Sequence, residues 1–398
     1  MLYRRFGRTN LQIPVLSCGG MRFQYKWQDM PLSEIPPESQ VNLEATVRRA
    51  LDLGINHIET ARGYGTSERQ LGLILPKFPR EKLIVQTKCT LTADPDLFTR
   101  NVEESFTRLN LNYVDLLALH GINDDEQLKF AVGEDGRSGC LAAARKLQKR
   151  GLVRHVGFST HAPTRVLLNA IRHEHNGGFD YVNLHWYYIF QRNWPAIEEA
   201  TRRDMGVFII SPSDKGGQLY KPSAKFVELC APLHPLAFNN LFCLSHPEVH
   251  TLSVGAARPS DFDAHIESLP LFENYRELLP PILHRLEQSL EALPPALRNP
   301  FNLLLPDWNE TPGQVNIPVI LWLRTLVKAY DLQEYAQMRY NLLGSGGHWF
   351  PGVNAGMIDS LDLSRIEAAT GLGDALKPML REAHDLLWKE PVKRLSQS

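Results

Sequence analysis

Short hydrophobic runs alternate with helical patterns along the first two thirds of the chain. The runs are rich in Val, Ile and Leu, with few polar positions between them, as expected of strands that are buried on both faces. We expect strands at residues 16–20, 55–59, 82–88, 113–120, 153–159, 181–186, 206–213 and 249–256. We expect helices at residues 41–53, 67–75, 95–110, 139–151, 162–174, 194–204, 223–230 and 259–268.

This repeated alternation of strand and helix predicts an α/β fold, a (β/α)8 TIM barrel, whose active site lies at the C-terminal ends of the strands. A doubly wound open sheet is the alternative. That fold would carry a G-x-G-x-x-G fingerprint after its first strand, whereas this chain has CGGMRF at residues 18–23. The barrel is therefore the simpler interpretation.

The alternation stops near residue 270, where helical patterns and loops rich in Pro and Gly take over. A length of 398 residues is enough for two or three domains. We expect a barrel at residues 1–272 and a mainly helical C-terminal domain at residues 273–398.

Composition narrows the class of protein. The net charge of −1 argues against a nucleic-acid binder, which usually has a basic surface. No run of about 18 apolar residues predicts a membrane span, and the N-terminus lacks the apolar segment of a signal peptide. We expect a cytoplasmic protein.

The cysteines and histidines predict neither a disulfide framework nor a metal site. The five cysteines are odd in number and form no C-x-x-C pair, and we expect most of them to be buried. The two histidines of HEH (172–174) would point to different faces of a helix.

Polar residues end three consecutive expected strands. Glu59 ends one and is followed by Tyr64 in the next turn, Lys88 ends the second, and His120 ends the third. In a barrel these four side chains would meet at one mouth. A lysine cation would lower the pKa of a nearby phenol, and a carboxylate would keep that lysine charged. The set suits protonation of a carbonyl oxygen during hydride transfer, with the hydride coming from a cofactor.

Several stretches carry a resemblance to a known family. They are GINHIETARGYGTSERQLG (54–72), IVQTK (84–88), YVDLLALHGI (113–122), VRHVGFSTH (153–161) and VHTLSVGAARPSDF (249–262). In order and spacing they resemble the aldo-keto reductase superfamily over about residues 1–270.

The resemblance implies a TIM barrel that binds NADPH, or less often NADH, without a Rossmann fold. Tyr64 would be the general acid, Lys88 would lower its pKa, and His120 would orient or polarise the carbonyl group. One position departs from the family, because Glu59 stands where aspartate is usual. Glutamate keeps the charge and adds a methylene.

The resemblance also implies a cofactor site. Ser159 and Asn183 would bind the nicotinamide carboxamide, and Ser211 with the loop that follows would lie along the pyrophosphate. Lys215 would supply a cation there, and Gly216 would allow a close backbone approach.

The last strand is followed by GAARPSDF, which starts at Gly255. Arg258 lies near the start of a helix, where its charge and fork geometry suit an adenosine 2′-phosphate, so NADPH is favoured over NADH. By resemblance, Asp261 and His265 fall near the positions that contact adenine.

The C-terminal domain resembles the ferredoxin-like module of one subgroup of these reductases. TPGQVNIP (311–318) and GGHWFPGVN (346–354) look like the ends of two cluster motifs with the spacing C-x2-C-x2-C-x3-C-P. The ligand positions would be Phe301, Leu304, Asp307 and Thr311, and Tyr340, Leu343, Gly346 and Phe350. None is cysteine, so we expect no iron–sulfur cluster. We expect Phe301, Leu304, Leu343, Trp349 and Phe350 to fill that space.

Three hypotheses remain. The first is an NADPH-dependent oxidoreductase that reduces a small aldehyde or ketone. The aromatics of residues 186–194 favour an apolar or flat substrate, and their loop would either line the pocket or mark an interface. The second is a non-catalytic NADP(H)-binding scaffold on the same barrel, with a protein partner docked on the C-terminal domain. The third is redox sensitivity through Cys89, beside Lys88. The C-terminal domain would be either a helical cap or a docking or lid surface.

Overall fold

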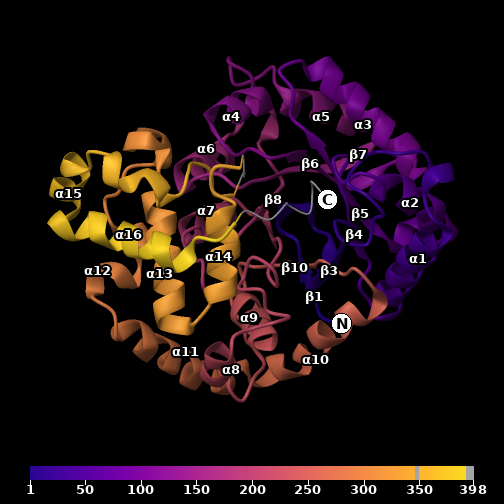
Figure 1. Cartoon of the computed structure of the whole chain (residues 1–398). Coiled ribbons are helices and arrows are strands. Elements are labelled where there is room, and N and C mark those ends of the chain that lie inside the picture. The colour runs from indigo at the N-terminus through magenta and orange to yellow at the C-terminus, as the bar shows by residue number, and fades with distance from the viewer. Residues whose placement is uncertain (346–348, 391–398) are drawn as a thin grey trace. The chain divides into compact units, whose positions relative to one another are not determined.

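The computed structural model describes residues 1–345 and 349–390, and eight of its parallel strands close into a barrel (Figure 1). The strands are β3 (Leu16–Gly19), β4 (His57–Glu59), β5 (Ile84–Thr90), β6 (Val114–His120), β7 (Val153–Ser159), β8 (Tyr181–Leu184), β9 (Gly206–Ile209) and β10 (Thr251–Val254). They pair in chain order, and β10 pairs with β3 to close the ring. The predicted (β/α)8 TIM barrel is confirmed.

Helices follow the strands as the sequence pattern predicted. They are α1 (Pro37–Asp52), α2 (Ser67–Ile74), α3 (Pro95–Leu109), α5 (Cys140–Lys149), α6 (Thr164–Arg172), α7 (Trp194–Arg202), α8 (Ala224–Cys230) and α10 (Asp263–Ser268). Local signals set the ends of α3: the Asp94 carboxylate accepts from the Asp96 N–H at 2.9 Å, Pro95 begins the helix, and Asn110 ends it in the left-handed conformation. These are common helix start and stop signals.

The sequence pattern missed four elements of the first 250 residues. They are the hairpin strands β1 (Tyr3–Arg5) and β2 (Gln12–Pro14), and the helices α4 (Asp125–Val132) and α9 (Pro235–Leu244). The two strands of the hairpin have only three residues each, too few to show a period.

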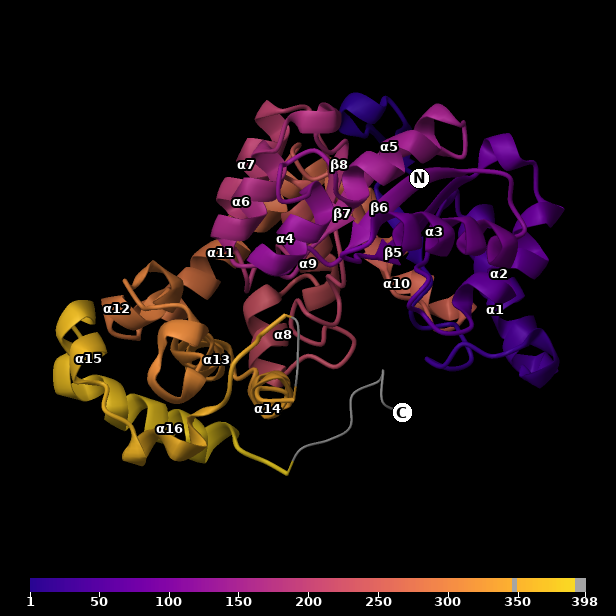
Figure 2. The same ribbon diagram turned by 90° about the horizontal axis from the view of Figure 1, so that it is seen from above.

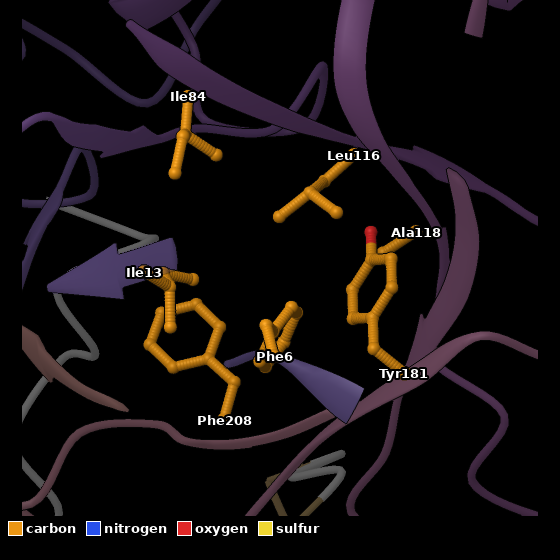
Figure 3. Close-up of a cluster of buried hydrophobic side chains, with 7 residues drawn as sticks. All are labelled: Phe6, Ile13, Ile84, Leu116, Ala118, Tyr181 and Phe208. Carbon is orange, nitrogen blue, oxygen red and sulfur yellow. The ribbon is translucent and has the colours of Figure 1, made fainter. Parts of the chain in front are cut away.

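The hairpin fills one end of the barrel (Figure 3). Phe6 and Ile13 from the hairpin pack in one cluster with side chains from the barrel strands. Those barrel residues are Ile84, Leu116, Ala118, Tyr181 and Phe208. Phe6 also lies where a side chain at Gly206 would have to go, since a Cβ there would be 2.6 Å from the ring. This end of the barrel is packed, which leaves the other end for chemistry.

The chain divides into two compact units. Of the described residues, the first contains 1–216 and 239–273, and the second contains 217–238, 274–345 and 349–390. The expected division at residues 272/273 stays a prediction, and the segment 217–238 packs with the later unit.

Beyond residue 273 the second unit is helical over the part that the structure describes (Figure 2). Its helices there are α11 (Tyr275–Glu291), α12 (Pro295–Arg298), α13 (Ile317–Tyr330), α14 (Gln333–Asn341), α15 (Ser364–Thr370) and α16 (Leu376–Leu387). The central helix α13 is buried along most of its length. None of the helices described is long and apolar enough to cross a membrane.

Candidate active site

Strand register brings the predicted polar residues to one end of the barrel. Thr90, two residues after Lys88, pairs with His120. His120 pairs with Ser159, and Ser159 pairs with Asn183. These residues therefore follow one another around the C-terminal rim.

Glu59 and Lys88 form a buried ion pair in the barrel. The Lys88 ammonium contacts the Glu59 carboxylate and donates to the carbonyl oxygen of Thr60 at 2.9 Å. Burial lowers the pKa of Lys88 well below its usual value. The carboxylate opposes that shift, because an opposite charge in contact favours the ammonium form.

Gly19 explains how a glutamate fits where the resembling family has aspartate. A Cβ at Gly19 would lie 3.3 Å from Glu59 Oε2, closer than most Cβ contacts. The missing side chain on the neighbouring strand thus leaves room for the extra methylene of Glu59. The longer carboxylate still reaches Lys88.

Tyr64 lies next to two of the candidate side chains, Lys88 and His120. The Lys88 ammonium is 4.6 Å from the centre of the Tyr64 ring, and the His120 ring meets it edge-on at 5.7 Å between centroids. Trp27 makes a second edge contact at 5.8 Å. The structure brings together all four residues predicted to be catalytic.

Burial of Tyr64 acts against the predicted lowering of its pKa. Burial raises the pKa of the Tyr64 phenol above its usual value, and the ammonium over the ring does not reverse that. The ammonium lies over the ring and makes a cation–π contact there.

The two residues predicted to bind the carboxamide differ in their hydrogen bonding. Ser159 Oγ accepts from the Gly121 N–H at 3.1 Å. The Asn183 side chain is buried, and neither its oxygen nor its nitrogen has a partner in the part of the chain that the structure describes. A buried amide without partners is costly. A primary carboxamide, with one acceptor and one NH2 group, would satisfy both atoms, so this position fits the nicotinamide group.

The loop after β9 has an unusual backbone. Ser211 has a positive φ of 54°, and its carbonyl accepts from the Lys215 N–H at 3.0 Å. A Cβ at Gly216 would overlap the Pro212 carbonyl oxygen, so only glycine fits there. This tight loop is where the pyrophosphate was predicted to bind.

Lys215 contacts a histidine network that the sequence did not predict. Its ammonium is 3.2 Å from His185 Nε2, which is 2.6 Å from His161 Nδ1. On the other side His185 Nδ1 is 2.5 Å from the Tyr187 hydroxyl, which donates to the Ile210 carbonyl. Because that hydroxyl gives away its only proton, it must accept one from His185 Nδ1. His185 Nε2 is then the acceptor that faces Lys215.

Arg258 and Asp261 contact each other at the end of β10. Arg258 is 72% exposed along its side chain, and its Nε donates to Asp261 Oδ1 at 3.1 Å. The other carboxylate oxygen accepts from the Ala257 N–H at 2.8 Å. Asp261 therefore stabilises the turn through its hydrogen bond with Ala257 and neutralises part of the charge on Arg258. Gly255 precedes them, next to the side chain of Arg22.

His265 lies inside the fold, whereas Arg258 is exposed. His265 is completely buried, and its two ring nitrogens face Ser213 Oγ at 3.3 Å and Asn240 Nδ2 at 3.1 Å. With both nitrogens engaged, it holds Ser213 and Asn240 in place, and its contact with adenine stays a prediction.

Two further expectations about exposed groups need correction. The aromatics at residues 186–190 are buried, and Trp186 stacks on Phe242 at 4.9 Å, so these side chains are core rather than pocket lining. Cys89 is also buried, and burial raises the pKa of its thiol to about 12, which leaves it inert. All five cysteines are buried, as expected for most of them. Among the residues described, no group of three or more His, Cys, Asp or Glu could hold a metal ion.

Comparison with known proteins gives a family match over part of the chain. Residues 15–203 match the model of the Aldo/keto reductase family. That range runs from β3 through β8 and contains the Glu59, Tyr64, Lys88 and His120 cluster together with Ser159 and Asn183. The remaining predicted cofactor residues, from Ser211 onward, lie outside it.

Curated relatives match over part of their length. L-Galactose dehydrogenase of Arabidopsis thaliana is 31% identical over 166 residues, which is 39% of this chain and 47% of the relative. L-Glyceraldehyde 3-phosphate reductase of Escherichia coli (strain K12) is 27% identical over 181 residues, 42% of this chain and 47% of the relative. The chain thus spans about half the length of these relatives.

Solved structures share the fold. An aldo-keto reductase from Bacillus halodurans in its holo form has a TM-score of 0.57 at 18% identity, covering 70% of this chain and 96% of its own. A thermostable aldo-keto reductase solved with the inhibitor epalrestat has a TM-score of 0.58 at 22% identity, covering 71% of this chain and 100% of its own.

Proposed function

We propose that this protein is an NADPH-dependent oxidoreductase that reduces an aldehyde or a ketone, with Tyr64 as the general acid. The observation that carries the proposal is the meeting of Tyr64, Lys88 and His120 at the barrel rim, with Glu59 paired to the lysine. The family match over residues 15–203 covers all four and supports this assignment.

In this proposal Tyr64 donates its phenolic proton to the carbonyl oxygen. The Lys88 ammonium over the ring would stabilise the phenolate that is left, and Glu59 would keep Lys88 charged and oriented. His120, edge-on to Tyr64, would orient the carbonyl group. Bound NADPH would supply the hydride that no side chain here can supply.

The cofactor would be held by residues on both sides of the rim. Asn183, with its unpartnered amide, would bind the carboxamide, next to Ser159. The loop from Ser211 to Gly216 would lie along the pyrophosphate, and Lys215 would supply a positive charge there. Arg258 would give up its hydrogen bond with Asp261 and bind the 2′-phosphate.

The first test is cofactor binding, measured by the fluorescence of NADPH and NADH with wild type and Arg258→Ala. We expect the variant to weaken NADPH binding and leave NADH binding unchanged. Arg150→Ala is the matched control, since Arg150 makes a similar exposed ion pair with Glu103. If wild type binds neither nucleotide, the reductase proposal fails.

The second test is carbonyl reduction by Tyr64→Phe. Loss of a general acid costs about 10²–10⁴-fold in rate, and NADPH binding should stay unchanged. Tyr113→Phe is the control, since that phenol accepts from Arg154 at 3.2 Å, away from the rim. Equal rates for wild type and Tyr64→Phe would contradict the role of Tyr64.

A second candidate is a non-catalytic NADP(H)-binding scaffold on the same barrel. The observation that favours it is the raised pKa of the Tyr64 phenol, which makes proton donation harder at neutral pH. Nucleotide binding without reduction of any carbonyl in a broad screen would select this candidate.

We further propose that the second unit is a ferredoxin-like module that lacks its cluster ligands. The two motif ends run side by side: Val315 bridges Val353 in parallel, and the Asn316 N–H donates to the Val353 carbonyl at 3.1 Å. Aromatic rings occupy the nearby space, with Trp322 5.8 Å from Phe301 and 5.4 Å from Phe350.

Of the residues predicted to fill the space of the missing clusters, Leu304 does not. Leu304 is 83% exposed, so it fills nothing, whereas Leu343 is buried. Gly346, one predicted ligand position, lies outside the described residues. Anaerobic reconstitution with iron and sulfide should give no visible absorption band, and a band would contradict the proposal.

A further inference from the structure

The loop after β3 forms a small cavity of about 250 Å3. Its lining is Met21, Arg22, Gln24, Tyr25, Lys26, Trp27 and Ala257. The lining contains two cations and no carboxylate. The volume is below the about 300–1,000 Å3 of sites for drug-sized ligands, so a small molecule or one group of a larger molecule would fill it.

This cavity is fixed against the turn that carries Tyr64. The Thr66 N–H donates to the Lys26 carbonyl at 3.1 Å, and the Tyr25 N–H is 3.0 Å from Gln70 Oε1. Gly65, in the turn next to Thr66, has a positive φ of 50°. A Cβ at Gly65 would overlap the Lys26 carbonyl oxygen. Loop and turn therefore form one rigid piece.

Trp27 connects the cavity to the proposed proton donor. Its ring lines the cavity and also meets the Tyr64 ring edge-on at 5.8 Å. Trp27 therefore separates the cavity from the Tyr64 ring by the width of one side chain.

Arg22 and Lys26 are exposed, and neither forms an ion pair with a carboxylate within residues 1–345 and 349–390. The Lys26 ammonium lies 5.2 Å from the centre of the Tyr25 ring. The stem of Arg22 lies against the backbone at Gly255, with Cδ 3.2 Å from where a Cβ would be. A planar guanidinium and a neighbouring ammonium suit a phosphate or a carboxylate.

We infer that this cavity binds the anionic group, phosphate or carboxylate, of a small carbonyl substrate, with Arg22 and Lys26 as its ligands. The inference rests on the proposed reductase function and names its substrate class. Trp27 would form the wall between the anion and the carbonyl group that Tyr64 protonates.

The first experiment measures binding without catalysis, by calorimetry with glycerol 3-phosphate, glycerate and glycerol. Wild type should bind at least one of the two anions and not glycerol, and the preferred anion shows whether phosphate or carboxylate is recognised. Arg22→Ala and Lys26→Ala should each weaken that binding by tenfold or more. Arg137→Ala, on an exposed loop before α5, is the matched control. Absence of anion binding by wild type, or equal binding by the variants, would overturn the inference.

The second experiment compares reduction of glyceraldehyde 3-phosphate and glyceraldehyde. Arg22→Ala should raise KM for the phosphorylated aldehyde tenfold or more and leave glyceraldehyde kinetics and the NADPH Kd unchanged. Weaker NADPH binding by this variant would assign Arg22 to the nucleotide and overturn the inference.

The two proposals fail in different ways. Reduction of glyceraldehyde with no advantage for its phosphate would keep the reductase function and overturn the anion site. Anion binding that needs Arg22, without reduction of any carbonyl, would keep the anion site and refute the reductase function.

Discussion

Replacing Asn183 by leucine should stabilise the protein without cofactor and weaken the binding of NADPH. Both polar atoms of the Asn183 amide are buried without partners, and each such atom costs about 1–3 kcal/mol. Leucine has nearly the same shape and removes both atoms, so we expect the free energy of unfolding to rise by at least about 2 kcal/mol. Sites kept for ligand binding often show this opposition between stability and function.

Urea denaturation with and without NADPH measures both effects. Wild type should gain about 2.7 kcal/mol at a hundredfold excess of NADPH over its Kd, and Asn183→Leu should gain far less at the same concentration. Asn193→Leu is the matched control. The Asn193 amide is buried but satisfied, since it donates to the His185 carbonyl at 3.0 Å and accepts from Thr164 at 3.4 Å. That variant should lose stability by about 1–3 kcal/mol. A loss of stability in Asn183→Leu comparable to that of the control would refute the reasoning.

Three other predictions concern packing and pH. Glu59→Asp should separate the carboxylate from Lys88 and leave a buried charge without its partner, costing about 3–5 kcal/mol in urea denaturation, and unchanged stability would show that the backbone closes the gap. Gly65→Ala should displace the loop at Lys26 and lower kcat/KM, which a steady-state assay would detect, while Gly151→Ala, also at positive φ but with no atom near its Cβ position, should not. Burial lowers the pKa of His57 to about 3 and of His250 to about 4. Above pH 6.5 both histidines are neutral in the folded and the unfolded chain, so they cost no stability there. As the pH falls below 6.5 the unfolded chain takes up these protons first, and each histidine should cost about 1.4 kcal/mol per pH unit until its folded pKa is reached. Denaturation curves at pH 7 and pH 5 measure this, and equal stability would contradict it.

The barrel was predictable because its strands are buried on both faces and each is followed by a helix pattern. Where prediction failed, the signal was too short or lay outside the periodic pattern. The hairpin strands Tyr3–Arg5 and Gln12–Pro14 have three residues each, and their packing partners come from distant strands. Burial of the aromatics at residues 186–190 depends on α9, which the pattern did not show.

The sequence predicted which residues meet in the candidate site, because a side chain at the end of a barrel strand lies at the rim. Glu59, Lys88 and His120 met as expected for this reason. The burial and hydrogen bonding of these side chains could not be predicted from their positions in the sequence. The burial that raises the Tyr64 pKa and the satisfied nitrogens of His265 depend on side chains packed from other segments. The His161–His185 contact was missed because the sequence pattern gave neither histidine a role.

The two halves of the proposed site have unequal support. The residues proposed for proton transfer and carboxamide binding all lie within residues 15–203, where the family pattern is recognisable. The pyrophosphate loop and Arg258 lie beyond that range, and residues 217–238, which continue the loop, pack with the second unit. The Ser211–Gly216 loop nevertheless has a strained backbone, with Ser211 at a positive φ and no room for a Cβ at Gly216. Strain of this kind persists only where the surrounding structure holds it. A binding measurement on this loop is therefore the most informative test of the cofactor site. A Cβ at Gly216 would overlap the Pro212 carbonyl oxygen, so Gly216→Ala should weaken NADPH binding more than Arg258→Ala does.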